Sequence, residues 1–234
     1  MNSFDASIIH FFNSFARRSV ILDNFMSYCT LDAFLIGAVP MALFWYAWVQ
    51  YGRPDIAKRK ILTLGILISV VALGVARVLA LSLPFRMRPF NTPALHFQAP
   101  YGVDSSNYIG WSSFPSDRTT LFVCVAAILW MVSRRLGILA FVYTFLVICL
   151  PTVYIGVHFP TDVLAGAALG IGVAAICNST RLTNFVASPV LHVSDARPGL
   201  FHATLFLWTF EIGELFHSVR SIILHALRFA KLMA

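Results

Sequence analysis

Long apolar stretches without charge impose the strongest constraint on how this chain folds. Four of them are the runs 33–51, 61–83, 136–157 and 163–178, in which Arg77 is the only charged residue. A helix needs about 20 largely apolar residues to cross the hydrocarbon core of a bilayer. With a shorter apolar run at 119–133, extendable back to Ser116, the sequence predicts an all-α, polytopic transmembrane bundle of five spans.

The composition supports this prediction and excludes other classes of protein. Hydrophobic residues make up 59% of the 234 residues and charged residues 12%, whereas a soluble domain carries about 25% charged residues. A disordered chain, a nucleic-acid-binding protein and an ordinary cytosolic enzyme are therefore not expected. The net charge of +7 fits cytoplasmic loops of a membrane protein better than a nucleic-acid partner. The four cysteines lack metal-site spacing, so we expect no disulfide, zinc or other metal site.

We divide the chain into an N-terminal segment (1–30), a transmembrane core (31–180) and a C-terminal segment (181–234). The run Phe4–Phe15 has helical spacing but includes Asp5, which indicates an interfacial or re-entrant helix, with a sixth span as the alternative. The C-terminal segment is predicted to be a polar linker followed by an amphipathic helix from Phe201 onward, lying on the membrane surface or against a partner.

Basic residues in the connections predict the sidedness of the bundle. They follow the first, third and fifth spans, at Arg53, Lys58, Arg59, Lys60, Arg134, Arg135 and Arg181. These connections lie on one side if the five spans alternate, and the positive-inside rule makes that side cytoplasmic. The segments 84–115 and 156–162 then lie on the extracytoplasmic side. In the fifth span, the spacing of Gly166 and Gly170 predicts close helix packing.

The extracytoplasmic segments carry polar residues suited to binding an anion. Ser116 and Asp117 suit a helix start, where free backbone N–H groups favour negative charge. Arg118 opposes that helix dipole, so we interpret it as an anion clamp, the alternative being contact with headgroups or Asp117. Arg86 and Arg88 can grip phosphate oxygens or anchor to headgroups.

Two further features indicate function. His158 and Asp162 are four residues apart, and a carboxylate at that reach can hold one imidazole nitrogen protonated while the other faces outward. Arg77 lies inside a span, where an ionisable residue is a functional hypothesis by default, and its side chain can extend to the outer face.

In this order the segments Phe85–Phe90, Ser113–Arg118 and Tyr154–Asp162 resemble the motifs of the type 2 phosphatidic acid phosphatase superfamily, over residues 60–178. The family pattern is Lys-x6-Arg-Pro, then Pro-Ser-Gly-His, then Ser-Arg-x5-His-x3-Asp. The Phe-Pro-Ser-Asp form of the second segment is familiar in the bacterial polyprenyl diphosphate branch. The resemblance implies a multi-pass protein of a bacterial cytoplasmic membrane with its site facing the periplasm or exterior.

The resemblance also assigns roles by position. Arg88 and Ser116 match the phosphate-binding residues, His158 matches the histidine that attacks phosphorus, and Asp162 matches the carboxylate that orients it. The reaction that this implies needs no metal or cofactor. Three family positions differ: Leu81 replaces a lysine, Thr152 an arginine, and Arg118 the histidine that serves as general acid.

An arginine cannot replace that acid, because a guanidinium does not release its proton at working pH. Protonation of the leaving oxygen by a general acid raises the reaction rate by about 10²–10⁴-fold. The absence of this acid matters least when the leaving group is itself a stable anion. We therefore expect an enzyme that acts on a lipid-linked phosphate or diphosphate of polyprenyl type. A transferase that uses a polyprenyl-phosphate-linked donor, such as a sugar, and a non-catalytic lipid-phosphate-binding protein are the alternatives. The lipid, the acceptor and the oligomeric state stay open.

Overall fold

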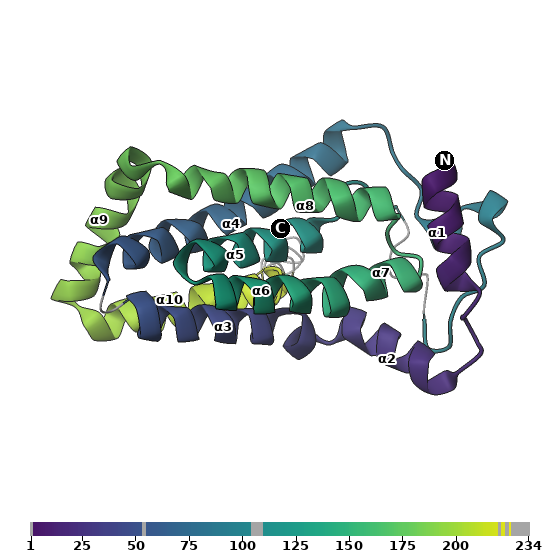
Figure 1. The fold of residues 1–234 in the computed structure, drawn as a ribbon, viewed down its shortest axis with the longest axis horizontal. Helices are drawn as coiled ribbons and strands as arrows, with labels where there is room; N and C mark the ends of the chain where they lie inside the picture. The colour runs from purple at the N-terminus through teal and green to yellow at the C-terminus, as the bar shows by residue number, and fades with distance from the viewer. Residues whose placement is uncertain (1, 53–54, 104–109, 220, 223–224, 226–234) are drawn as a thin grey trace, which may run out of the picture.

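The computed structural model describes residues 2–52, 55–103, 110–219, 221–222 and 225, and helices are the only regular secondary structure in them. Several helices lie roughly along one axis of the molecule, side by side, and further helices lie across both ends (Figure 1). The prediction of an all-α membrane bundle is confirmed for these residues.

Five helical rods form the core. The first is α2 (Val20–Leu31), a π-helical turn (Phe34–Ala38), α3 (Val39–Ala47) and a second π-helical turn (Trp48–Gly52). The second is α4 (Ile56–Ser82) and the third α5 (Asp117–Val132). The fourth combines α6 (Arg134–Tyr143), a π-helical segment (Thr144–Cys149) and α7 (Leu150–Tyr154). The fifth is α8 (Pro160–Ala174) with a 3-10 turn (Ala175–Asn178).

Four of these rods contain a helix that is long and apolar enough to cross a membrane: Phe34–Tyr51, Ile56–Ser82, Arg134–Tyr154 and Pro160–Asn178. The helix α5 has 16 residues, about 24 Å at 1.5 Å per residue, and it packs against α4, α6 and α8. Most of its side chains are buried. The third predicted span is therefore the central helix of the bundle.

Glycines bring α5 and α8 together, as the spacing of Gly166 and Gly170 predicts. A Cβ atom on Gly166 would lie 2.6 Å from the Ser116 carbonyl oxygen, and one on Gly170 would lie 2.5 Å from the Thr120 carbonyl oxygen. Only a residue without a side chain permits this approach. It places the first turns of α5 and α8 beside each other, and the Ser116 N–H donates to the Asp162 carbonyl at 3.1 Å.

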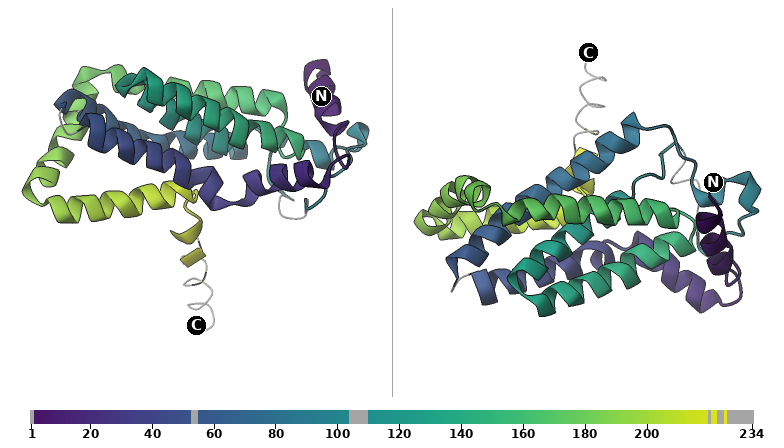
Figure 2. Two further views of the ribbon diagram at one scale, coloured as in Figure 1. Left: turned by 60° about the horizontal axis from the view of Figure 1, so that its bottom comes forward. Right: turned by 45° about the horizontal axis from the view of Figure 1, so that its top comes forward.

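The N-terminal helix predicted at 4–15 is present as α1 (Ser3–Asn13). It lies across the end of the bundle where α7 ends and α8 begins (Figure 2). Its exposed phenylalanines, among them Phe4 and Phe11, suit a helix at a membrane interface. The described parts of the connection between α4 and α5 (83–103 and 110–116) and the α7–α8 turn lie at this end, whereas α9 (Thr180–Ala196) covers the opposite end (Figure 1).

The prediction of a polar linker at the start of the C-terminal segment is wrong. The expected linker is the helix α9, because its polar residues bind the start of α4: Arg59 donates to Asp195 at 3.1 Å and Lys60 to Asn184 at 2.9 Å. The first part of the amphipathic helix predicted from Phe201 onward belongs to α10 (Pro198–Gly213), which is apolar around most of its surface.

The helix α10 runs back along α3 rather than away from the bundle (Figure 2). The close approach depends on two glycines, because a Cβ on Gly37 would lie 2.0 Å from the Gly213 carbonyl oxygen. Trp45 also donates its indole N–H to Thr209 at 3.0 Å. Most of the basic residues of the predicted amphipathic helix, Arg220, Arg228 and Lys231, lie outside the described residues.

Candidate active site

His158 lies on the turn between α7 and α8, and its side chain is almost fully buried. Gly156 gives this turn its shape with a φ of 77°, a conformation that glycine adopts without strain. The amides of Val157 and His158 both donate to the Thr152 carbonyl, at 2.9 and 3.2 Å. The end of α7 thus fixes the backbone that carries the imidazole.

One hydrogen bond determines which nitrogen of the imidazole is available. Nδ1 of His158 lies 2.8 Å from the Ser113 carbonyl oxygen. A carbonyl can only accept, so Nδ1 carries the proton and Nε2 keeps its lone pair when the ring is neutral. Ser113 comes from the loop before α5. The sequence did not indicate this role, because the group that accepts the imidazole proton is a backbone carbonyl and not a side chain.

Asp162 lies near His158 without a direct hydrogen bond to it. Its Oδ2 atom is 3.8 Å from Nδ1 of His158 and accepts instead from the Phe159 N–H at 2.7 Å. The predicted pairing of imidazole and carboxylate is therefore corrected: the Ser113 carbonyl is the direct acceptor. Asp162 holds the first turn of α8 and acts on the ring as a nearby negative charge.

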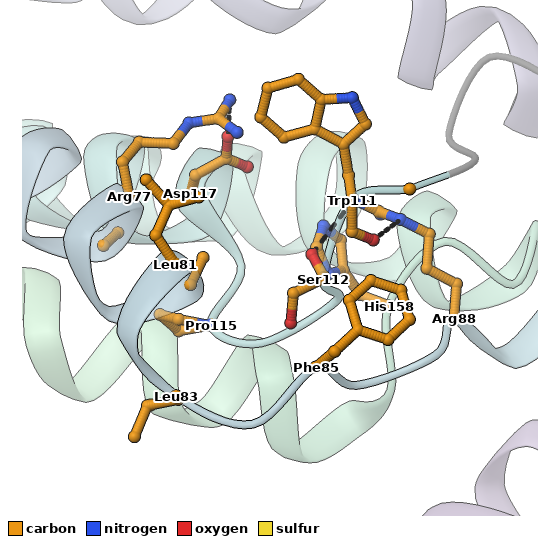
Figure 3. A pocket seen from close by; sticks show the side chains of 13 residues that line it. Arg77, Leu81, Leu83, Phe85, Arg88, Trp111, Ser112, Pro115, Asp117 and His158 are labelled. Carbon is orange, nitrogen blue, oxygen red and sulfur yellow. Dashed lines mark hydrogen bonds and ion pairs between the residues drawn. The ribbon is translucent and has the colours of Figure 1, made fainter.

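His158 borders a cavity of about 230 Å³ between the end of α4, the loop 110–115 and the start of α5. The polar side chains around it are Arg77, Arg88, Ser112, Asp117 and His158, and the apolar ones include Ala76, Ala80, Leu83 and Phe85 (Figure 3). The structure thus brings together four of the predicted site residues: Arg77, Arg88, Asp117 and His158.

Arg88 connects the segments that form this cavity. Its guanidinium donates to the carbonyls of Val157 at 3.0 Å, Trp111 at 3.3 Å and Ser112 at 3.4 Å. The side chain is 8% exposed. Since Val157 precedes His158, the arginine fixes the turn that carries the imidazole and places a cation on the same cavity wall.

Arg77 and Asp117 form an ion pair across the cavity wall, and the two side chains point toward each other in Figure 3. The Arg77 guanidinium also lies 5.4 Å from the centre of the Trp111 ring, within the range of a cation–π contact. Arg77 lies one helical turn before Leu81, which holds the family's lysine position. A cation thus lies near the place where the sequence lacks one.

Four predicted site residues are absent from the described lining of this cavity: Asp162, Arg86, Ser116 and Arg118. Ser116 is fully buried, and its hydroxyl lies 2.9 Å from the Thr119 hydroxyl. Arg118 points to the other side of α5 and donates to the Thr30 carbonyl at 2.6 Å. In this conformation neither side chain lies at the phosphate-binding site to which the sequence assigned it.

Arg86 forms a different cluster on the α1 side of the turn. Its guanidinium donates to Asp162 at 2.5 Å and to Asp5 at 2.6 Å, and it lies 4.3 Å from the centre of the Phe159 ring. The expectation that Arg86 binds phosphate is therefore corrected, because two carboxylates occupy its donors.

Two observations complete the description of the site. The Ser113 hydroxyl is buried and has no hydrogen-bond partner among the described residues. The same residues contain no group of three or more His, Cys, Asp or Glu side chains placed to hold a metal ion.

Comparison with known proteins agrees with the motif pattern. The family model of the PAP2 superfamily matches residues 61–185. The bacitracin transport permease protein BcrC of Bacillus licheniformis is 33% identical over 110 residues, 45% of this chain and 50% of that protein. The chain thus spans about half the length of this curated relative. A crystal structure of a PAP2-type phosphatidylglycerolphosphate phosphatase from Bacillus subtilis matches with a TM-score of 0.51 at 23% identity, covering 74% of this chain and 82% of that one, which shows a shared fold.

Proposed function

Because the chain belongs to the PAP2 superfamily, we propose that it is an integral membrane phosphatase that acts on a lipid-linked phosphate at the end of the bundle that holds His158. The observation that carries this proposal is the state of the imidazole. Nδ1 donates to the Ser113 carbonyl, and the ring borders a cavity that also holds Arg77 and Arg88. A buried, oriented imidazole beside two guanidinium groups suits nucleophilic attack on a phosphoryl group.

In the proposed reaction, Nε2 of His158 attacks the terminal phosphorus of the substrate. The bond between phosphorus and the leaving oxygen breaks, and the phosphoryl group is held on Nε2. Water then attacks that phosphorus, inorganic phosphate leaves, and the neutral imidazole is restored. Asp162, 3.8 Å from Nδ1, stabilises the positive charge that the ring gains while it carries the phosphoryl group.

The leaving group determines which substrates suit this site. The family's acid position is Arg118, whose side chain is turned to Thr30 on the far side of α5. Without an acid beside the leaving oxygen, a lipid alkoxide departs slowly, whereas a lipid monophosphate departs as a stable anion. These features favour a lipid diphosphate, of which polyprenyl diphosphates are the class expected, over a phosphomonoester such as phosphatidic acid.

The walls of the cavity support a lipid rather than a soluble substrate. Its α4 side is formed by Ala76, Ala80, Leu83 and Phe85, near the end of a helix that can cross the membrane. A chain attached to the phosphate can lie along this apolar wall. By the positive-inside rule, the basic starts of α4, α6 and α9 are cytoplasmic, and the site faces the periplasm or exterior.

The direct test is phosphate release by purified full-length protein in detergent micelles, with polyprenyl diphosphate and phosphatidic acid as parallel substrates. We expect His158→Ala to lower turnover by at least about 10³-fold, as loss of a nucleophile does. His10→Ala is the matched control, because His10 is an exposed histidine at the same end of the molecule. Equal turnover by His158→Ala and the wild type would refute the mechanism.

Transfer to another acceptor is the second candidate, and Asp117 is the observation that favours it. A phosphate-binding site does not itself need a carboxylate, yet Asp117, paired with Arg77, borders the same cavity as His158. It could accept the proton of an acceptor hydroxyl that replaces water in the second step. Mass spectrometry of the lipid products distinguishes the two reactions: hydrolysis yields inorganic phosphate, and transfer yields a new phosphorylated product.

A further inference from the structure

The feature that leads beyond the proposed function is a buried charge cluster between α1 and the start of α8. It consists of Asp5, Arg86, Thr161 and Asp162. Asp5 and Asp162 are both fully buried, and Arg86 lies between them, 2.6 Å from Asp5 and 2.5 Å from Asp162. Asp5 lies outside the residues 61–185 that match the family model.

Asp5 contacts α8 as well as Arg86. Its Oδ1 atom accepts from the Thr161 N–H at 3.0 Å, and Oδ2 accepts from the Thr161 hydroxyl at 2.7 Å. The Thr161 N–H belongs to the first turn of α8 and has no acceptor within the helix. A carboxylate at a helix N-terminus is favourable, and here it comes from a helix far away in the sequence.

The cluster also controls which way Asp162 turns. Arg86 binds Oδ1 of Asp162, and the Phe159 N–H binds Oδ2. Held in this way, the carboxylate stays 3.8 Å from Nδ1 of His158, and the Ser113 carbonyl accepts the imidazole proton. Arg86 is itself held between Asp162 and Asp5, so the position of Asp162 depends on α1.

We propose that Asp5 is a positioning residue for the reaction at His158: it anchors Arg86 and the first turn of α8 so that Asp162 keeps its place beside the imidazole. This inference rests on the proposed function. Asp5 acts through Arg86 and Thr161, and it is absent from the described lining of the substrate cavity. The N-terminal helix is then part of the catalytic machinery rather than a membrane anchor alone.

The test compares Asp5→Asn with Asn13→Ala in the full-length protein. Asn13 also docks α1, through two hydrogen bonds to the backbone of Gln98 at 2.7 and 2.9 Å, but contacts neither Arg86 nor α8 in these bonds. We expect Asp5→Asn to lower kcat by about 10- to 100-fold, as a small misplacement of a reacting group does. Its KM should stay within about threefold of wild type, and Asn13→Ala should change neither constant by more than about threefold.

Each result decides the question. A kcat for Asp5→Asn within threefold of wild type would overturn the inference, and so would equal losses in the two variants, which would indicate docking of α1 alone. If Asp5→Asn does not fold, Thr161→Val replaces it, since this variant removes the hydroxyl and keeps all charges. A reduced kcat in Thr161→Val then supports the inference, and an unchanged kcat overturns it.

Full activity of His158→Ala would refute the proposed function, whereas an inactive His158→Ala with an active Asp5→Asn would refute only the role of Asp5.

Discussion

Arg86 and Arg88 are two residues apart in the same loop, yet they belong to opposite sides of the site. Arg86 lies between two buried carboxylates, Asp5 and Asp162, on the α1 side. Arg88 donates to backbone carbonyls and borders the cavity beside His158 on the α4 side. In an extended segment, residues i and i+2 ordinarily share a face, so the folded loop and not the spacing separates them. The comparison shows that identical side chains in one motif can have different surroundings: one pairs with buried carboxylates, and the other lines the cavity beside His158.

The largest effect in this comparison is expected from Arg88→Ala. The change removes the cation on the cavity wall and the support of the turn that carries His158. We expect kcat/KM for phosphate release to fall by about 10²–10³-fold. The kcat/KM of Arg88→Lys should lie between those of Arg88→Ala and the wild type, because lysine keeps the positive charge but lacks the forked donors of a guanidinium group. The control is Arg18→Ala, an exposed arginine in the N-terminal segment. A loss of less than tenfold would contradict a role for Arg88 at the phosphate.

Arg86→Gln should produce a smaller loss of activity and a larger loss of stability. It leaves two buried carboxylates without their cation, which costs about 3–5 kcal/mol in the free energy of unfolding. We expect kcat to fall by about 10- to 100-fold with little change in KM. Thermal unfolding in detergent and steady-state kinetics measure the two effects. A raised KM with an unchanged kcat would instead place Arg86 at the substrate.

Both sides of the site depend on the close contact of α5 and α8, which Gly170→Leu should disturb. A Cβ at this position would lie 2.5 Å from the Thr120 carbonyl oxygen, whereas a Cβ on Gly172 would meet no atom of a neighbouring helix within 4 Å. Overpacking costs about 1–3 kcal/mol, so we expect Gly170→Leu to lower the unfolding temperature and to reduce activity by tenfold or less. Gly172→Leu is the matched control. Equal unfolding temperatures for the two variants would contradict the packing.

The sequence predicted those parts of the molecule that depend on local chemistry. Apolar runs predicted the rods, and the spacing of Gly166 and Gly170 predicted the α5–α8 contact. The motif positions predicted that Arg88 and His158 belong to one site. The linker predicted at the start of the C-terminal segment is the helix α9, because its polar residues bind the start of α4, a tertiary contact that leaves no local signal.

The remaining errors concern which partner a charged side chain finds. Asp5 and Arg86 are far apart in sequence, and no pattern in either segment indicates that they meet. The acceptor for His158 is the carbonyl of Ser113, and every residue has a carbonyl, so residue type cannot reveal it. A motif can therefore indicate which residue to expect at the site, while the groups that hold its side chain are recognised only in the folded chain.

The smallest effect is expected from Arg118→Ala, although Arg118 occupies the position of the family's general acid. Its guanidinium donates to the Thr30 carbonyl at the end of α2, so its loss should cost about 1 kcal/mol of stability. We expect kcat to stay within about threefold of wild type, and Arg118→His to give no gain, because the side chain at this position faces α2. Steady-state kinetics on both substrates measure this. A loss of more than tenfold in Arg118→Ala would mean that the guanidinium leaves Thr30 when the substrate binds, and that the positive charge of this motif reaches the leaving group after all.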